Sequence, residues 1–134
     1  MLPFEFTIKG PPVSLQTKSR PRLAAWKSDV ASAAQQCIDQ GAIPVVVQVD
    51  VCITYYYEGD TPDVDNIIKP IQDALVGIVY VDDAQVAETK SRKRAIDGSY
   101  RIRGVSACLL AAFSAGDEFL HIRVSEASAT EVLD

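Results

Sequence analysis

The sequence predicts an α+β fold, in which a single small domain spanning residues 1–134 packs two to three helices on a mixed β-sheet. A chain of 134 residues fits one compact domain with a real core, but not two. Several segments alternate apolar and polar residues with a period of two, as strands do, and others repeat apolar residues at helical spacing. The composition, 48% hydrophobic and 23% charged, is typical of a globular protein.

The N-terminal third predicts a strand and then a helix. The segment FEFTI, residues 4–8, alternates with a period of two, and a glycine and two prolines close it with a turn. A polar, basic loop follows. From residue 23 to residue 40 apolar side chains recur at helical spacing, and a glycine followed by a proline ends the predicted helix.

The middle third predicts strand, helix and strand. Residues 44–59 give the clearest strand pattern, because every second residue from 45 to 53 is valine or isoleucine. Residues 66–76 predict a helix that a glycine ends. The segment IVYV, residues 78–81, then predicts a short buried strand that leads directly into Asp82 and Asp83.

The C-terminal third predicts a hairpin, a helix and a last strand. Residues 84–95 and 100–104 are the arms of the hairpin, joined by an Asp-Gly turn. A serine caps the helix predicted over residues 107–115, and a glycine ends it. Residues 119–126 predict the last strand, and from about residue 126 we expect a mobile tail.

Several classes of protein are argued against by what the sequence lacks. The start, MLPFEFTIKG, does not have the basic and apolar regions of a signal peptide, and the longest apolar stretch is shorter than the roughly 20 residues that cross a bilayer. We therefore expect a soluble, cytoplasmic protein with no membrane partner. Cys37, Cys52 and Cys108 are expected to be buried free thiols. A lone histidine, His121, and the absence of a CxxC pair argue against zinc.

The net charge of −5 argues against nucleic acid on its own, because phosphate binding usually accompanies a surplus of cations. The distribution of charge changes this conclusion. Residues 9–27 carry five cations and no acid, residues 90–103 carry six cations and one acid, and residues 58–88 between them carry eight acids and one lysine. Basic flanks around an acidic centre suit an enzyme that grips a polyanion, although solvated charged faces would give the same pattern.

The segment PDVDNIIKP, residues 62–70, holds the first acidic motif. Asp63 and Asp65 point to the same side if the segment is extended, so their carboxylates could share a ligand. If a helix begins nearby, Lys69 and Asp73 follow at intervals of four residues along one stripe. Pro70 requires that helix to start late or to kink. The alternative is structural: one aspartate caps the helix, and Lys69 and Asp73 form an exposed ion pair.

Asp82 and Asp83 form a second acidic cluster at the end of a predicted strand. Adjacent side chains of a strand face opposite ways, so we expect one of the two to meet Asp63 and Asp65. Three carboxylates at one point repel one another unless a cation lies between them. Magnesium is bound through a few carboxylates and can promote phosphodiester cleavage, with Lys69 placed to hold the phosphate.

Other ligand motifs do not fit. In an EF-hand calcium loop the third acidic position would fall on Ile67 and the invariant glycine on Ile68. The sequence has no Gly-rich phosphate loop and no GxSxG elbow, so we expect no nucleotide cofactor.

Together, DVDNIIK with the following DAL, then GIVYVDDAQV and a lysine-rich strand, resemble the pattern of the RusA family of Holliday-junction resolvases. The similarity is contiguous over about residues 60–94, and IKGPPVSLQTKSRPR is more weakly similar to the family's opening strand and basic loop. The acidic net charge and residues 104–118, which look like an insertion, depart from the family pattern.

The resemblance implies a homodimeric endodeoxyribonuclease that uses Mg²⁺, or Mn²⁺ in its place, to cut paired strands of branched DNA such as a four-way junction. The metal-binding catalytic aspartates would be Asp63, Asp65 and Asp83, the catalytic lysine would be Lys69, and Asp82 would be an auxiliary or structural acid. A two-fold dimer would present one site to each strand. The expected DNA-binding cations flank these acids: Lys18, Arg20, Arg22, Lys90, Arg92, Lys93 and Arg94.

Two alternatives remain at this point. One is a dimeric DNA-binding protein that has lost catalysis and keeps its acids for structure. The other is a glycosyl transferase that uses DVD to bind a sugar nucleotide, which the short chain argues against because such enzymes need a nucleotide-binding domain.

Overall fold

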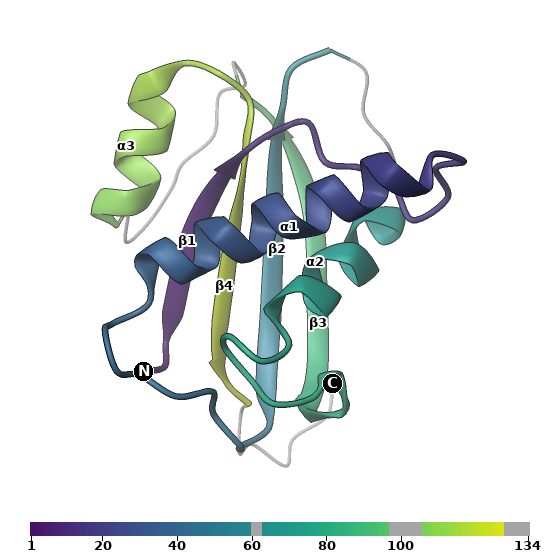
Figure 1. The fold of residues 1–134 in the computed structure, drawn as a ribbon. Coiled ribbons are helices and arrows are strands. Elements are labelled where there is room, and N and C mark those ends of the chain that lie inside the picture. Colours follow the sequence, from purple (N-terminus) through teal and green to yellow (C-terminus); the bar gives the residue numbers. More distant parts are fainter. Residues whose placement is uncertain (60–62, 97–105, 128–134) are drawn as a thin grey trace, which may run out of the picture.

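The structure is a computed structural model that describes residues 1–59, 63–96 and 106–127. Within these residues the centre is a four-stranded mixed sheet, whose strands run in the order β1 (Phe4–Lys9), β4 (Phe119–Glu126), β2 (Val49–Tyr57) and β3 (Val86–Ala95) (Figure 1). The pairs β1–β4 and β4–β2 are antiparallel, whereas β2 and β3 are parallel. The predicted α+β class with a mixed sheet and helices is confirmed.

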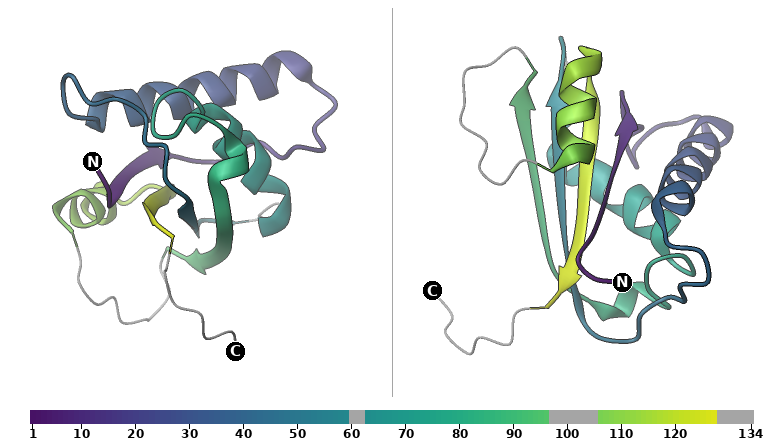
Figure 2. Two further views of the ribbon diagram at one scale, coloured as in Figure 1. Left: turned by 90° about the horizontal axis from the view of Figure 1, so that it is seen from below. Right: turned by 90° about the vertical axis from the view of Figure 1, so that its left-hand side faces the viewer.

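The helices divide the sheet into two faces. Helices α1 (Arg20–Cys37) and α2 (Ile68–Leu75) lie together on one side of the sheet, which we call the α1–α2 face (Figure 2). Helix α3 (Ala107–Ala115) lies beside β1 and packs Leu109 and Phe113 against Tyr56 and Phe119. It therefore covers one end of the other side of the sheet, which we call the opposite face.

The main core lies between the sheet and the α1–α2 face. Val51, Ile53 and Tyr55 of β2 are fully buried there, as are Val30 of α1 and Ile71 of α2. Burying each such side chain contributes roughly 1.5–3 kcal/mol. This core fixes the position of α2 over β2 and β3. It therefore also fixes the position of the polar residues that α2 carries.

Helix α1 starts and stops earlier than the predicted residues 23–40. The Ser19 hydroxyl caps its first turn by accepting a hydrogen bond from the Arg22 amide at 3.3 Å, and a proline occupies that first turn, where it needs no amide partner. The helix ends at Cys37 because Ile38 has extended dihedral angles, φ −80° and ψ 142°. Cys37 is exposed, so the expectation that all cysteines are buried was wrong.

The long strand predicted over residues 44–59 was wrong at its beginning. Strand β2 starts at Val49, and before it only Val45 forms an isolated bridge, with Tyr80. The amide nitrogen of the Gln85 side chain donates to the carbonyls of Val45 and Val47, at 2.9 and 2.8 Å. A side chain thus satisfies carbonyls that a strand partner would otherwise take.

The helix predicted over residues 66–76 is present in two parts. A 3₁₀ turn, η1 (Val64–Ile67), leads into α2, and Gly77 ends the helix with a positive φ of +83°. The predicted strand IVYV was wrong, because within it Tyr80 alone makes isolated bridges, to Val45 and Val76. A second 3₁₀ turn, η2 (Asp83–Gln85), follows and opens directly into β3.

The cation-rich strand predicted over residues 84–95 is confirmed as β3, and its pairing with a second hairpin arm stays a prediction. Within the described residues it forms an edge strand parallel to β2. The second predicted arm, residues 100–104, and the predicted tail beyond residue 127 lie outside the described residues. The predictions of a helix over residues 107–115 and a strand over 119–126 are confirmed. In the part of the chain that is described, no helix is both long enough and apolar enough to traverse a membrane.

Candidate active site

The first two aspartates lie at the start of η1 and are exposed. Asp63 occupies the N-cap position, yet its side chain makes no capping hydrogen bond, and Asp65 lies in the first turn. The structural alternative made one aspartate a helix cap. Asp63 does occupy the cap position, but its carboxylate takes no part in capping. Both carboxylates are available to a ligand from solvent.

Pro70 explains why the motif begins as a 3₁₀ turn and not as one long helix. A proline lacks an amide hydrogen, so it is tolerated in the first turn of α2, where the amides have no intrahelical partner, and not further along. The helix accordingly starts at Ile68, which places the exposed Lys69 in its first turn. The local sequence thus separates the two aspartates from the helix, and Lys69 follows Asp65 by four residues.

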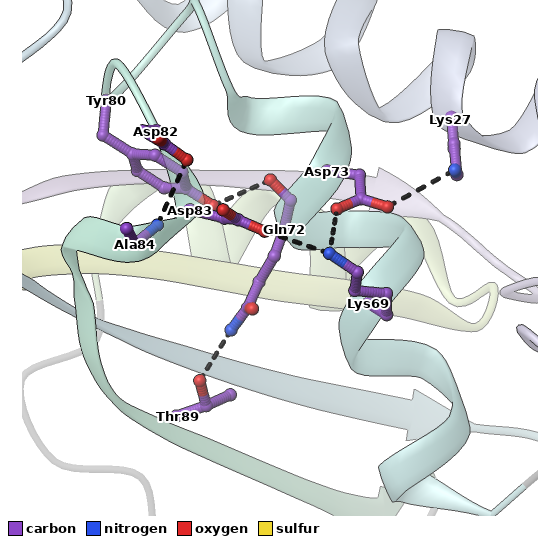
Figure 3. Close-up of polar contacts among 9 residues, drawn as sticks. All are labelled: Lys27, Lys69, Gln72, Asp73, Tyr80, Asp82, Asp83, Ala84 and Thr89. Carbon is purple, nitrogen blue, oxygen red and sulfur yellow. Dashed lines mark hydrogen bonds and ion pairs between the residues drawn. The ribbon is translucent and has the colours of Figure 1, made fainter.

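Lys69 lies between two carboxylates. Its Nζ atom is 2.8 Å from Oδ1 of Asp73, one helical turn on, and 3.0 Å from Oδ2 of Asp83, which comes from η2 (Figure 3). The hydrogen bond to Asp73 is the larger cause, and the one to Asp83 the next, of a raised pKa of Lys69. Lys69 is therefore a permanent cation at neutral pH, and it joins α2 to the second acidic cluster.

Asp82 and Asp83 have different tasks. The Asp82 carboxylate accepts a hydrogen bond from the Ala84 amide at 3.3 Å, and so caps η2. Asp83 is exposed, and its pKa is lowered first by the hydrogen bond from Lys69 and then by a hydrogen bond with Asp82. Asp82 is thus a local structural acid, as the family resemblance implies, and Asp83 is the acid that meets the lysine.

Gln85 holds the loop that carries Asp83. Its side-chain oxygen accepts hydrogen bonds from the amides of Val81 and Asp82, both at 2.9 Å, and its side-chain nitrogen donates to Val45 and Val47. One amide side chain thereby ties the acidic loop to the segment that precedes β2. The sequence analysis missed this role, although the spacing D-x-x-Q is that of a capping box and could have indicated it.

Further polar contacts support the same region (Figure 3). Lys27 of α1 approaches the second oxygen of Asp73 at 3.4 Å, so Asp73 lies between two lysines. The Tyr80 hydroxyl donates to the backbone carbonyl of Gln72 at 2.8 Å, and the Gln72 side chain donates to the Thr89 hydroxyl at 2.6 Å. These contacts join α1, α2, the loop before η2 and β3 around Lys69. No local pattern in the sequence indicated the roles of Lys27 and Gln72.

The donor atoms of Asp63, Asp65 and Asp83 suit a hard divalent cation in their chemistry, because all three are exposed carboxylates. Their placement does not form a finished site. Among residues 1–59, 63–96 and 106–127, no three acidic, histidine or cysteine side chains are grouped closely enough to hold a metal ion. The positive charge beside the Asp83 carboxylate is that of the Lys69 side chain.

The predicted DNA-binding cations lie in two groups. Lys18, Arg20 and Arg22 are exposed at the start of α1, and the loop before them is joined to the acidic motif by a hydrogen bond of 2.9 Å from the Leu15 amide to the Asn66 carbonyl. The cations of β3 alternate between the faces of the sheet. Lys93 lies on the α1–α2 face, with its Nζ 6.0 Å from the ring centre of Tyr57.

The other β3 cations, Lys90, Arg92 and Arg94, belong to the opposite face. Register places Arg92 beside Thr54 and Arg94 beside Tyr56, both of which face away from the main core. Arg92 Nε donates to the Thr54 hydroxyl at 2.9 Å. The structure therefore does not bring all four β3 cations to the side of the sheet that holds the aspartates.

A small α+β domain in which exposed carboxylates meet a lysine, with exposed cations nearby, has the features of a protein that acts on a polyanion. A family model described as Endodeoxyribonuclease RusA matches residues 7–103, more than half of the chain. The chain belongs to this family of endodeoxyribonucleases, as the sequence motifs predict. The match ends at residue 103, and the interpretation of residues 104–118 as an insertion stays a prediction. No curated protein matches the chain.

Proposed function

We propose that this protein is an endodeoxyribonuclease that cuts branched DNA, in particular four-way junctions, in recombination and repair. Membership of the RusA family supports the reaction class. The observation that carries the proposal for this chain is the position of Lys69 between Asp73 and Asp83, close in sequence to the exposed Asp63 and Asp65.

In the proposed site Lys69 binds the phosphate at the point of cleavage and balances its growing negative charge. A preorganised cation of this kind typically contributes a factor of about 10²–10³ to the rate. Asp73 keeps Lys69 in place on one side, so the lysine remains at the site when its other partner, Asp83, is engaged elsewhere. Asp73 would therefore be a positioning residue.

Asp63, Asp65 and Asp83 are the residues that would hold Mg²⁺, or Mn²⁺ in its place. When bound, such an ion would supply charge stabilisation and an activated water for phosphodiester hydrolysis. The exposed oxygens of the three aspartates, with no capping duty for Asp63, support this assignment.

A homodimer accounts for paired cuts. The chain carries the four proposed catalytic positions once, and a junction is resolved by cutting two strands, so two copies related by a two-fold axis would supply one site to each strand. We accordingly propose that the active species is a dimer.

The experiment that tests the proposal uses purified protein and a synthetic four-way junction, with and without Mg²⁺. We expect symmetric cleavage that requires the ion. The variant Asp65→Asn should lose cleavage and still bind the junction, because it keeps the shape of the side chain and removes only its charge. Wild-type protein that binds the junction but never cuts it would contradict the proposal.

One observation favours the second candidate, a catalytically degenerate DNA-binding dimer. Within the described parts of the chain, Asp63, Asp65 and Asp83 are not grouped as a metal site, and Asp83 is paired with Lys69. The same experiment separates the candidates. A degenerate protein would bind the junction equally well with wild-type aspartates or with asparagines in their place, and would show no cleavage with either Mg²⁺ or Mn²⁺.

A further inference from the structure

Strand β3, which is an edge strand within the described residues, presents cations on both faces of the sheet. Three contacts fix its orientation on the α1–α2 face: the Thr89 hydroxyl meets Gln72, the Ser91 hydroxyl donates to the Val64 carbonyl at 2.7 Å, and Lys93 lies over Tyr57. Since side chains alternate along a strand, the neighbours at even positions leave from the opposite face. These are Lys90, Arg92 and Arg94, all exposed, and we call them the opposite-face row.

One member of the opposite-face row, Arg92, is held over the sheet. Arg92 Nε is held at 2.9 Å by Thr54 of the neighbouring strand β2, whose side chain is 1% exposed. Burial raises the pKa of Tyr56, also on β2, and the positive charges of Arg92 and Arg94 partly offset this rise. The Arg92 guanidinium therefore lies over β2, on the side of the sheet away from the aspartates. The Arg94 side chain leaves β3 on the same side, and its Nη1 donates to the Lys93 backbone carbonyl at 2.8 Å.

Arg92 and Arg94 lie further along β3 than the acids of their own face, whereas Lys90 lines one hollow with Asp50 and Glu88. Asp50 and Glu88 pair at the beginning of β2 and β3, whereas Arg94 pairs with Tyr56 near the other end. From Lys90 to Arg94 the strand advances by about 13 Å, at roughly 3.3 Å per residue, with no acid in that interval. Such a row is complementary to a chain of phosphates.

We infer that the opposite-face row binds a different duplex arm of a branched DNA from the arm that enters the Asp–Lys site. This inference rests on the proposed function. A phosphate chain bound at Lys69 and Asp83 would lie on the same side of the sheet as Lys93. The side chains of Arg92 and Arg94 leave β3 on the other side. A junction has further arms leaving its branch point, and one of them can pass along the other side of the edge strand. The row would thus help the protein to prefer branched over linear DNA.

The matched variants are Lys93→Gln and Arg94→Gln. They are neighbours on one strand, each removes one positive charge, and they belong to opposite faces. Arg92 is not the best choice, because its loss leaves the buried Thr54 hydroxyl without this donor. The charge-preserving variant Arg94→Lys is the control for shape. Binding is measured in EDTA by fluorescence anisotropy, over a range of salt, with a four-way junction and with a linear duplex made from the same arms.

We expect Arg94→Gln to weaken junction binding severalfold, to lower the salt slope for the junction by about one, and to leave duplex binding nearly unchanged. Lys93→Gln should weaken binding to both DNAs, and Arg94→Lys should resemble wild type. Two outcomes overturn the inference: equal losses on both DNAs with both glutamine variants, which indicate one duplex running along the edge, or no loss with Arg94→Gln. Failure of the proposed function itself is seen separately, in wild-type protein that does not prefer the junction.

Discussion

Nζ of Lys69 and Oδ2 of Asp83 lie 3.0 Å apart, although 14 residues separate them in the sequence. This contact joins the first turn of α2 to the 3₁₀ turn before β3, and so joins the two acidic motifs. Both side chains are close to half exposed, at 49% and 44%, so water screens the pair and its contribution to stability is small. Its importance lies in placing a fixed cation at a carboxylate in the proposed catalytic site.

The first prediction concerns the charge of Lys69. The variant Lys69→Met keeps a long, unbranched side chain and removes the cation, so cleavage of a four-way junction should fall by about 10²–10³-fold. Lys27→Met is a matched control, because Lys27 also contacts Asp73 but lies 3.4 Å from its other oxygen, on the side away from Asp83. Single-turnover cleavage rates of the two variants provide the measurement.

A comparable loss of rate in both lysine variants would mean that Asp73, and not Lys69, is the group that matters. Retention of the full rate in Lys69→Met would remove the lysine from the mechanism.

The second prediction concerns pH. Because the folded-state pKa of Asp83 is lowered by Lys69, its stabilising effect is present above the unfolded pKa of about 3.9 and is lost as pH falls through the folded pKa. Because the pKa of Lys69 is raised, first by Asp73, its effect is present below about 10.4 and is lost as pH rises through the folded pKa. The difference in the free energy of unfolding between wild type and Asp83→Asn should therefore be constant near neutrality.

That difference should shrink when denaturation is repeated from about pH 5 downwards. A difference that instead grows with acidity would show that Asp83 is stabilised in its protonated form, which contradicts the ion pair.

The third prediction concerns Gln85. In Gln85→Glu a carboxylate replaces the nitrogen that donates to the carbonyls of Val45 and Val47, so like partial charges meet. We expect a loss of about 2 kcal/mol in the free energy of unfolding at pH 7. The amides of Val81 and Asp82 should also exchange their hydrogens faster, because the loop that they belong to is no longer tied down.

The sign of the pH dependence distinguishes this effect from a general loss of packing. The neighbouring carbonyls disfavour the charged glutamate, so its pKa is raised, and lowering the pH through that pKa restores a donor and part of the stability. Gln35→Glu, at an exposed position of α1, is the control for added charge. A loss of unfolding free energy in Gln85→Glu that does not vary with pH would argue against a stabilising role for the hydrogen bonds from Gln85 to Val45 and Val47.

The fourth prediction concerns the start of α1. Ser19→Ala removes the hydroxyl that caps the Arg22 amide, and should lower the free energy of unfolding by about 1 kcal/mol in urea denaturation. Ser28→Ala, at an exposed position within the same helix, should be neutral or slightly stabilising, because alanine has the higher helix propensity. Equal effects in the two variants would show that Ser19 is not a cap.

Local patterns predicted the elements that depend on local interactions. The alternation of residues 4–8 and 119–126 and the capped segment 107–115 were enough for β1, β4 and α3. The motifs around Asp63 and Asp83 indicated acids and a lysine that could converge, and the structure brings Lys69 and Asp83 together.

The elements that were wrong depend on contacts distant in sequence. Residues 44–48 have the composition of a strand, but the Gln85 side chain takes up their carbonyls from 38 to 40 positions away. The pairing of β3 with β2 likewise follows from packing that no local pattern contains. The division of the β3 cations between two faces could be seen only once the face that holds Lys69 was known.

The most direct test of one catalytic site built from both acidic motifs is a double-mutant cycle on the single-turnover rate of junction cleavage, with Asp65→Asn, Asp83→Asn and the double variant. Residues that act as a unit show strongly non-additive losses. We predict that each single variant loses most of the activity and that the double variant is little worse than either. Losses that multiply, or full activity in one of the single variants, would contradict a shared site.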